Sequence, residues 1–281
     1  MPKHGNIDKY VKVSVSRSGK KMRSRASLTK GEKHEVKRIA KRLDDKNKQL
    51  HEKIFCSPSD AGTGPTYTNF LFPGIPSAAS SLIDLFPQIS QGSNREERSG
   101  SRIKLTGVKC KFWFHIPTDQ PASGDNSVMC CRLLVLSSKT IKQFSLLESN
   151  WDAGELLNRK YLRDGSSDTS FLGDMKSLNF PVNTALFTTH YDKRFTLNRG
   201  QLVGDDSAGY TRQVDPAKQL RLSLKVKSIK VRWTDDSATE SDNFAPMAIL
   251  CYAPINGGHT LGTGGVVQGN TLVHTTWKNL D

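Results

Sequence analysis

The stretch 102–116 has the most regular pattern in the chain. Val108, Cys110, Phe112 and Phe114 occupy alternate positions, with polar or charged residues between most of them. Successive side chains of a β-strand point to opposite faces, so this pattern buries one face of a strand and leaves the other polar. It predicts a long strand of a sheet that is covered on one side only.

Similar strand-like runs recur after residue 54, between turn signals rich in Gly, Pro, Asp and Asn. They are 66–72, 102–116, 128–137, 184–198, 219–233, 245–253 and 271–277. Inside this part only 145–159 has the spacing of a helix, and no alternation of strands with helices appears. Many strands with long polar loops predict an all-β fold, an antiparallel sandwich or barrel.

The run 219–233 has two distinct faces. Its apolar residues keep one phase up to Val226 and the other phase from Ile229 on, which predicts a β-bulge near Ser228. The opposite face is basic, with Arg221, Lys225, Lys227, Lys230 and Arg232. Two interpretations stay open. This face binds a polyanion, or it is a solvated basic edge that prevents aggregation.

Most of the excess positive charge lies in the first fifth of the chain. Residues 1–53 hold 17 Lys or Arg against 6 Asp or Glu, a net charge of +11 out of +14 for the 281 residues. The sequence therefore predicts a basic arm over 1–53, disordered over 1–28, and a β domain over 54–281. Within the arm, Thr29 and Glu32 have capping-box spacing and predict an amphipathic helix over 29–50. The apolar stripe of this helix is Val36, Ile39, Ala40, Leu43 and Leu50.

The arm has the chemistry of a polyanion-binding segment, because its cations neutralise phosphates and release counterions without reading bases. The alternative is a solvated charge run with no partner. The predicted nucleic-acid-binding residues of the arm and of 219–233 are Lys9, Lys12, Arg17, Lys20, Lys21, Arg23, Arg25, Lys37, Arg38, Lys41, Arg42, Arg221, Lys225 and Lys227. The residues that also suit a nuclear import signal are Arg17, Lys20, Lys21, Arg23 and Arg25.

No arrangement of residues typical of catalysis is present. The seven histidines are scattered, and the pair His190 and Asp192 is the best candidate for an acid–base pair. Asp235 and Asp236 suit an acidic turn more than a divalent-ion site, and the glycines of 257–269 lack the Gly-Lys-Ser/Thr of a phosphate loop. We expect a protein that is not an enzyme and that needs no cofactor and no metal.

The chain has no run of apolar residues that is long enough to span a bilayer, and its beginning lacks the apolar core of a secretory signal. The five cysteines follow no Cys-x-x-Cys spacing. They predict buried or inert thiols in a reducing, intracellular compartment, with no membrane partner.

The phrase "QGSNREERSGSRIKL" covers residues 91–105 and leads into the strand 102–116. With Gln91, Gly92, Arg98, Gly100 and Ile103 in the matching places, it resembles a phrase of capsid proteins from small single-stranded DNA viruses of the circovirus–geminivirus-like group. Shell domains of the tombusvirus type share similar phrasing. The resemblance implies a single jelly roll of two packed four-stranded antiparallel sheets that assembles with copies of itself into an icosahedral virion. It also implies packaging of a single-stranded genome, DNA being favoured, with a nuclear stage in which a host import receptor is a partner.

The resemblance also gives the charged loop (residues 91–102) a role. At the point where the chain enters the sandwich, opposed charges would set the docking of neighbouring subunits, and an Arg98→Glu subunit would fold but assemble poorly. The predicted subunit-interface residues are Arg95, Glu96, Glu97, Arg98 and Arg102. The alternative is a polar turn that merely starts a strand.

Two other functions stay open. One is the capsid of a small RNA virus. The other is a non-viral nucleic-acid-binding β-barrel. It needs an aromatic stacking platform, for which Trp113, Phe114 and Trp233 are the candidates.

The arm departs from the arginine-dense arms of circoviruses, since it holds twelve lysines and five arginines.

Overall fold

A computed structural model divides the chain into two compact units, Met1–Asn47 and Lys48–Asp281. It describes residues 30–47, 50–57, 70–77, 81–117, 128–152, 160–199, 201–205, 210–214, 217–226, 229–255 and 265–280. The first unit contains α1 (Lys30–Asn47), within the range where a helix is predicted. Val36 and Ile39 of its apolar stripe are 51% and 47% exposed. Leu50 lies beyond the end of the helix, and Thr29 and 1–28 lie outside the described residues.

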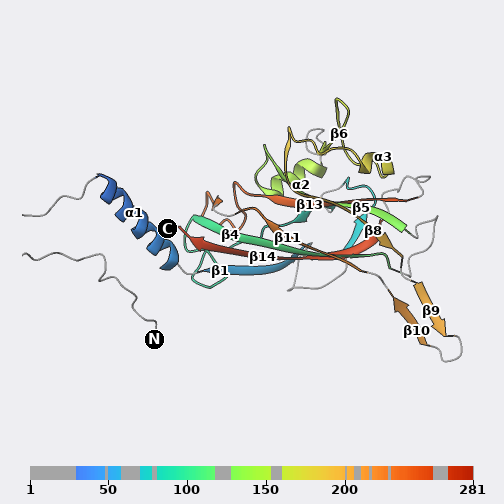
Figure 1. The fold of residues 1–281 in the computed structure, drawn as a ribbon, viewed down its shortest axis with the longest axis horizontal. Coiled ribbons are helices and arrows are strands. Elements are labelled where there is room, and N and C mark those ends of the chain that lie inside the picture. The colour runs from blue at the N-terminus through green and yellow to red at the C-terminus, as the bar shows by residue number, and fades with distance from the viewer. Residues whose placement is uncertain are drawn as a thin grey trace, which may run out of the picture. The chain divides into compact units, whose positions relative to one another are not determined.

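The second unit contains two antiparallel sheets (Figure 1). Sheet I has the order β1 (His51–Ser57), β14 (Gly265–Asn279), β4 (Arg102–His115), β11 (Lys218–Leu224), with β2 (Phe70–Pro73) beside β14 and β12 (Lys230–Arg232) beside β4. Sheet II has the order β3 (Ile83–Asp84), β13 (Pro246–Pro254), β5 (Val128–Ser138), β8 (Phe187–Asn198).

The order of the strands is that of a single jelly roll. Of the eight strands on the two main paths, taken in chain order, sheet I holds the first, eighth, third and sixth, and sheet II the second, seventh, fourth and fifth. Apart from β5 and β8, which pair with each other in sheet II, consecutive strands of this set lie in opposite sheets, which is the arrangement of two Greek keys wrapped into a sandwich. The predicted all-β jelly roll is confirmed, with β2 and β12 as additions to sheet I.

The main core lies between the inner faces of the two sheets. The alternating residues predicted to be buried, Phe112 and Phe114 among them, pack here against Leu133 of β5 and Leu250 of β13, and all four are at most 2% exposed. Tyr252 links the sheets, because its hydroxyl donates a hydrogen bond to the Phe72 carbonyl at 2.6 Å. Burying each large apolar side chain stabilises the fold by about 1.5–3 kcal/mol.

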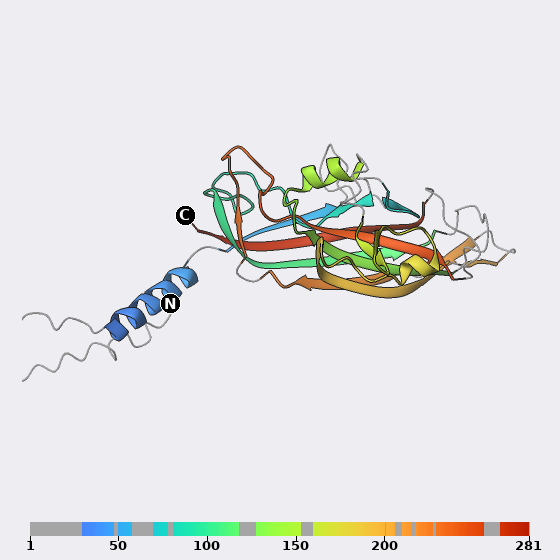
Figure 2. The same cartoon turned by 90° about the horizontal axis from the view of Figure 1, so that it is seen from above.

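A second core covers the outer face of sheet II. The elements over it are α2 (Phe144–Asp152), β6 (Leu162–Asp164), β7 (Ser167–Thr169) and α3 (Met175–Leu178), and Figure 1 shows α2, β6 and α3 on the side of β13 and β5. All nine residues of β13 are buried, which explains why this strand is a continuous apolar run rather than an alternating one. The view from above in Figure 2 shows α2 alongside the long strands.

Arg132 of β5 attaches the covering segment to sheet II. It is 3% exposed and forms an ion pair with Asp192 of β8, with distances of 2.8 Å from Nε to Oδ1 and 2.6 Å from Nη2 to Oδ2. Its Nη1 donates to the carbonyl of Leu178 at 2.9 Å. A buried guanidinium with its donors satisfied in this way specifies one position for the segment.

The run 219–233 is two strands, β11 and β12, and not one strand with a bulge. Leu224 of β11 lies opposite Val108 of β4, whereas Lys230 of β12 lies opposite Lys104, so five residues stand against three. On the other side of β4, Thr106 is the extra residue where the register with β14 shifts. The register of β4 with the segment 219–233 and its register with β14 therefore both change at the same level of the sheet. Ser228, the predicted site of the bulge, lies outside the described residues.

The structure differs from the sequence prediction at β1 and at β9 and β10, and it contains the helix predicted within the second unit. Residues 51–53, assigned to the arm, belong to β1 and pair with β14. The helix predicted over 145–159 is α2, described to Asp152. β9 (Gln201–Asp205) and β10 (Tyr210–Val214), which lie outside the predicted strands, form an antiparallel pair. All five cysteines are free, and three of them are buried. Among the described residues no helix has the length and hydropathy to cross a bilayer.

Candidate nucleic-acid interface

The outer face of sheet I is strongly basic. The strands of this sheet contain one acidic residue, Glu52, whereas the strands of sheet II contain two acidic and three basic residues. The basic face is defined here as the outward Lys and Arg residues of sheet I and its connection, namely Arg102, Lys104, Lys109, Lys111, Arg221, Lys225, Lys230, Arg232 and Lys278. Their phase is opposite to that of the core residues, so they all project away from sheet II.

Cations of the basic face stand directly opposite one another on neighbouring strands. Arg221 lies opposite Lys111, Lys230 opposite Lys104, and Arg232 opposite Arg102. On the other side of β4, Lys278 also lies opposite Lys104. Like charges at directly opposed positions destabilise a sheet. An anion bound to this face would relieve the repulsion between the opposed cations.

Several cations of the basic face form no ion pair with another described residue. Glu52 forms a salt bridge with Arg95 at 2.8 Å, and its Oε2 lies 3.2 Å from Nε2 of His274; neither partner belongs to the basic face. Within the described part of the chain, Lys109, Lys111 and Arg221 form no salt bridge. A regular two-dimensional array of cations is the chemistry that binds a phosphate backbone without reading its sequence.

The structure brings together some of the predicted binding residues. Arg221 and Lys225 are exposed on the basic face, and Lys37 and Arg38 are exposed on α1 in the other unit, where Arg38 pairs with Glu35. The predicted residues that lie outside the described residues, in whole or in their side chains, are Lys9, Lys12, Arg17, Lys20, Lys21, Arg23, Arg25, Lys41, Arg42 and Lys227. For these the nucleic-acid-binding and nuclear-import roles stay predictions.

Sequence reasoning missed the cations of β4 and β14. Lys104, Lys109, Lys111 and Lys278 belong to the basic face as much as Arg221 does. The signal was present for β4, because Lys109 and Lys111 occupy the non-apolar phase of the strongest alternating run. The pairing of β4 with both β11 and β14 was not visible in the sequence, and this pairing turns separate basic edges into one surface.

The charged loop is organised around Arg98, whose side chain is fully buried. Its guanidinium lies 4.7 Å from the ring of Trp233. It donates to the carbonyl oxygens of Gly100 at 2.7 Å, Asp236 at 2.8 Å and Ala238 at 2.8 Å, with longer contacts to Ile89 and Asp235. Burial lowers the pKa of Arg98, and the carboxylates of Asp236, Asp235 and Asp242 oppose that shift. Arg98 therefore joins the charged loop to the turn 233–240 inside one subunit.

Other residues of the quoted phrase also take part in contacts within the charged loop. The amide of Gly92 donates to the Arg98 carbonyl at 2.9 Å, and Gln91 forms a bridge with Arg98. A Cβ atom at Gly92 would lie 2.0 Å from Oε2 of Glu97, the carboxylate that accepts from the Asn94 amide at 2.9 Å. A side chain at this position would therefore move the carboxylate of Glu97 away from the Asn94 amide.

The structure argues against the expectation that an Arg98→Glu subunit folds, because a carboxylate would replace a buried cation that bonds to five carbonyl groups. Arg95 bonds to Glu52 within the subunit, and Arg102 belongs to the basic face. Glu96 is exposed, and the interface role of Arg95, Glu96, Glu97 and Arg102 stays a prediction.

The three candidate stacking residues differ in exposure. Phe114 is fully buried in the core. Trp233 is 3% exposed, lies under Arg98 and donates its indole N–H to the carbonyl of Thr239 at 3.2 Å. Trp113 is half-buried on the outer face of sheet I. Only Trp113 is therefore accessible to a base.

The candidates for other chemistry have structural roles. His190 bonds to the hydroxyl of Ser137 at 2.8 Å, and its pKa is lowered by burial and by Lys142, while Asp192 pairs with Arg132. Asp235 accepts a hydrogen bond from the amide of Ser237 at 2.9 Å. Among the described residues no group of three or more His, Cys, Asp or Glu side chains is placed to hold a metal ion.

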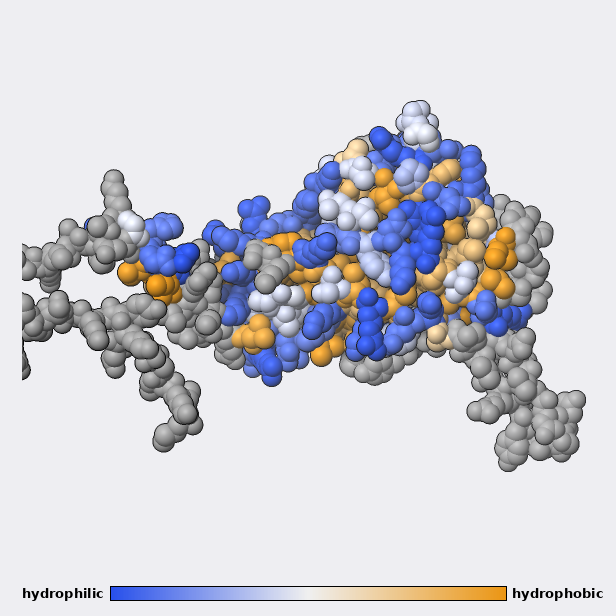
Figure 3. All heavy atoms as spheres, in the orientation of Figure 1, coloured by the Kyte–Doolittle hydropathy of each residue, from blue (hydrophilic) through white to orange (hydrophobic). Residues whose placement is uncertain are grey.

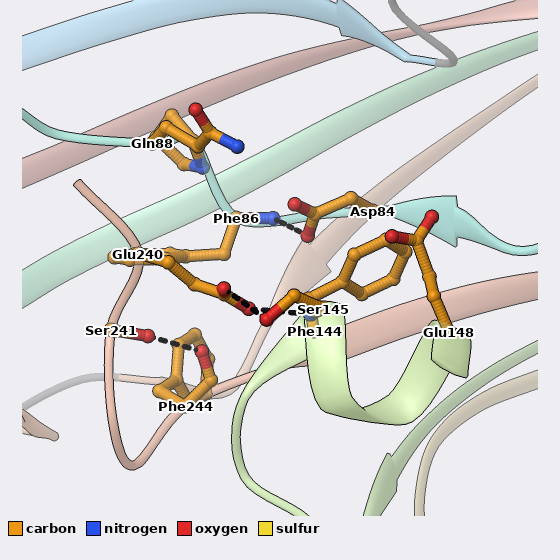
Figure 4. Close-up of a pocket in the computed structure, with 10 residues that line it drawn as sticks. Asp84, Phe86, Gln88, Phe144, Ser145, Glu148, Glu240, Ser241 and Phe244 are labelled. Carbon is orange, nitrogen blue, oxygen red and sulfur yellow. Dashed lines mark hydrogen bonds between the residues drawn. The ribbon is translucent and has the colours of Figure 1, made fainter. Parts of the chain in front are cut away.

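A small acidic cavity lies between α2 and the turn 240–244 (Figure 4). Its volume of about 50 Å³ accommodates water rather than a substrate. Glu240 accepts hydrogen bonds from the amide and the hydroxyl of Ser145, at 2.7 and 2.6 Å, near the start of α2. Asp84 accepts from the amide of Phe86 at 2.9 Å. Burial raises the pKa of Asp84 to about 8, and Glu240 and Glu148 add to the shift.

Asp84 is expected to make the stability of the subunit depend on pH. Its pKa is about 8 when folded and 3.8 as the ordinary value, so the folded protein holds an extra proton between these values. The stability that this proton provides is full below about pH 4 and is lost as the pH rises through 8. Asp84→Asn keeps the oxygen acceptor for Phe86 and removes the charge. Thermal unfolding should show a variant that matches the parent near pH 4 and exceeds it at pH 8–9 by on the order of a few kcal/mol.

Asp164→Asn is the control, because Asp164 is exposed and pairs with Lys176 at the surface. It should leave the difference in stability between the two pH values unchanged. Equal pH dependence in the parent and in Asp84→Asn would show that the carboxyl group of Asp84 does not carry this effect.

Comparison with known proteins gives structural neighbours alone. No protein-family model and no curated protein matches the sequence. The cryo-EM structure of the mud crab tombus-like virus matches with 11% identity over 95% of this chain and 87% of that chain, at a TM-score of 0.31. The T=3 Penaeus vannamei nodavirus structure matches with 9% identity over 94% of this chain and 59% of that chain, at a TM-score of 0.28. The function proposed below therefore rests on the geometry of the chain itself.

Proposed function

We propose that this protein is the capsid subunit of a small virus, which assembles with copies of itself into a closed shell and packages single-stranded nucleic acid without catalysis. The observation that carries the proposal is the basic face of a jelly roll, with cations opposed across neighbouring strands. Such a surface suits a shell lining that meets a packaged genome, because the phosphates of the genome would neutralise the opposed cations.

The outer faces of the two sheets differ, as the outer and inner sides of a shell subunit would. The outer face of sheet II is covered by a second core, whose members include Trp151, Tyr161 and Phe171. The outer face of sheet I keeps exposed cations. A subunit of this kind has one face suited to the exterior or to neighbours and one suited to a polyanion, so we place sheet I toward the lumen of the shell.

The charge of the arm and that of the basic face complement each other. In a shell of about 60 subunits, arms of net charge +11 would supply roughly 660 positive charges, too few for a genome of more than about a thousand nucleotides. The nine cations of the basic face would add roughly 500 more. The sheet surface therefore supplies charge that the arms alone do not.

The cargo is proposed to be DNA on the basis of the sequence phrase around Arg98 and Gly100, with the basic segment 17–25 as an import signal for a nuclear stage and a host import receptor as its partner. RNA fits the same charges, and the 2′-hydroxyl is the group that would separate the two.

The proposal is tested by purifying the full-length protein and measuring its size, its ratio of ultraviolet absorbance at the nucleic-acid and protein maxima, and its shape by negative-stain microscopy. Uniform closed particles that hold nuclease-protected nucleic acid are expected, and sequencing the cargo identifies it as DNA or RNA. A monomer that binds nucleic acid only at low salt, and never forms particles, would establish the non-viral binding module instead.

A further inference from the structure

A hollow of about 390 Å³ opens on sheet I beside the basic face. It is lined by Cys56 of β1, Trp113 of β4, and Asn270, Thr271 and Leu272 of β14. This volume lies in the range of roughly 300–1,000 Å³ that is typical of small-molecule sites. Figure 3 shows hydrophobic patches interspersed with hydrophilic residues over the side of the molecule seen in Figure 1.

The backbone fixes the floor of the hollow. Asn270 of β14 lies directly opposite Trp113 of β4. The residue that precedes it, Gly269, lies opposite Phe114. A Cβ atom at Gly269 would lie 2.1 Å from the carbonyl oxygen of Trp113. Glycine therefore lets β14 approach β4 closely at this point and holds the indole and the amide of Asn270 on one surface.

Cations lie beside the hollow, in the neighbouring rows of paired residues across sheet I. Leu272, which lines it, lies opposite Lys111, and Lys111 lies opposite Arg221 on the far side of β4. One further row along, His274 lies opposite Lys109. An aromatic ring with an adjacent amide, bordered by an array of cations, combines the three features that bind an unpaired nucleotide: stacking on the base, hydrogen bonding to its edge, and neutralisation of its phosphate.

We propose that this hollow binds one unpaired nucleobase of the packaged strand, which stacks on the indole of Trp113 while Asn270 hydrogen-bonds the base edge and Lys111 and Arg221 bind the flanking phosphates. The inference rests on the proposed function, because it assigns the occupant of the same basic face. The occupant is single-stranded DNA or RNA, since a paired base has no exposed ring to stack.

The fluorescence of the full-length protein reports on this site. Of the four tryptophans, Trp151, Trp233 and Trp277 are at most 3% exposed, so only Trp113 is open to contact quenching. A short oligothymidylate is expected to quench the tryptophan emission, whereas an abasic strand of equal length and heparin bind the cations without quenching. Equal quenching by the abasic strand, or none by the oligothymidylate, would overturn the proposal.

Affinity provides the second readout. Trp113→Ala should weaken binding of the oligothymidylate by about 5- to 100-fold and leave the affinity for the abasic strand unchanged, as expected for loss of one stacked base. Trp113→Phe keeps a ring and should retain most of the preference. Ile54→Ala, which removes an exposed apolar residue of β1 whose register partner is His274 rather than a residue lining the hollow, is the matched control and should have no effect. An unchanged preference in Trp113→Ala would contradict the assignment.

Alkylation of thiols tests the site without a variant. Cys56 lines the hollow, whereas Cys130 is a half-buried thiol of sheet II. Bound oligothymidylate should slow the alkylation of Cys56 and leave that of Cys130 unchanged. If Cys56 and Trp113 are already protected without nucleic acid, another part of the chain fills the hollow and the inference fails. Particle formation is scored on the same samples, so loss of the base site and loss of assembly are seen separately.

Discussion

Replacing Arg98 with methionine is expected to destabilise the subunit by about 3–5 kcal/mol, a large part of the roughly 5–15 kcal/mol that is typical of a folded domain. Methionine fills much of the volume of the side chain but leaves the carbonyl groups of Gly100, Asp236 and Ala238 buried without their donor. Urea unfolding of the soluble protein, or its yield in soluble form, measures the effect. Arg98→Lys should lose nearly as much, because one ammonium group cannot reach acceptors on both segments.

Arg95→Met is the matched control. Arg95 lies three residues away in the same charged loop, and its side chain is 64% exposed in its salt bridge with Glu52. An exposed pair of this kind contributes at most about 1 kcal/mol, so the control should unfold close to the parent. If Arg98→Met unfolds within 1 kcal/mol of Arg95→Met, the charged loop is a surface feature, and the account of its buried centre is wrong.

Removing three charges from the basic face is expected to weaken nucleic-acid binding without weakening the fold. The triple variant Lys109→Gln, Lys111→Gln, Arg221→Gln should bind single-stranded nucleic acid at least about tenfold less tightly at low salt. The slope of log affinity against log salt should fall by about 2, since each phosphate contact contributes about 0.7. The free energy of unfolding should stay equal or rise, because the variant removes the electrostatic repulsion between Lys111 and Arg221, which lie directly opposite each other.

The matched control removes the same charges from the other side of the molecule. Lys139, Lys193 and Arg194 are exposed at or beside sheet II, so their replacement by Gln changes the net charge equally. This variant should retain the affinity and the salt slope of the parent. If both triple variants lose the same affinity, net charge alone explains binding, and the basic face has no special role.

The strands with one clear face were predictable, and those that depend on pairing were not. The alternation of Val108 to Phe114 identified β4, and the apolar run of 245–253 identified β13. β1 was missed because its charged residues Glu52 and Lys53 and its exposed Ile54 show no alternating apolar pattern and resemble the composition of the arm. Its place in sheet I comes from pairing with β14, more than 200 residues away in the chain. Periodicity carries no information on such long-range partners.

The candidate site shows the same division. Arg221 and Lys225 were identified because they lie in an alternating run, where the polar phase marks an outward face. Arg98 was assigned to a subunit interface because a sequence does not distinguish a buried arginine from an exposed one. Its acceptors on the turn 233–240 are 137 to 140 residues distant in the chain. The hollow beside Trp113 is likewise made by three strands that only the fold brings together.

The most direct measurement is a cryo-EM reconstruction of the particles that the full-length protein forms. The account predicts a closed shell in which sheet I faces the lumen and density for nucleic acid lies over Lys109, Lys111 and Arg221. A shell in which sheet I faces the exterior or is buried between subunits would contradict the central claim that the basic face lines the packaged genome.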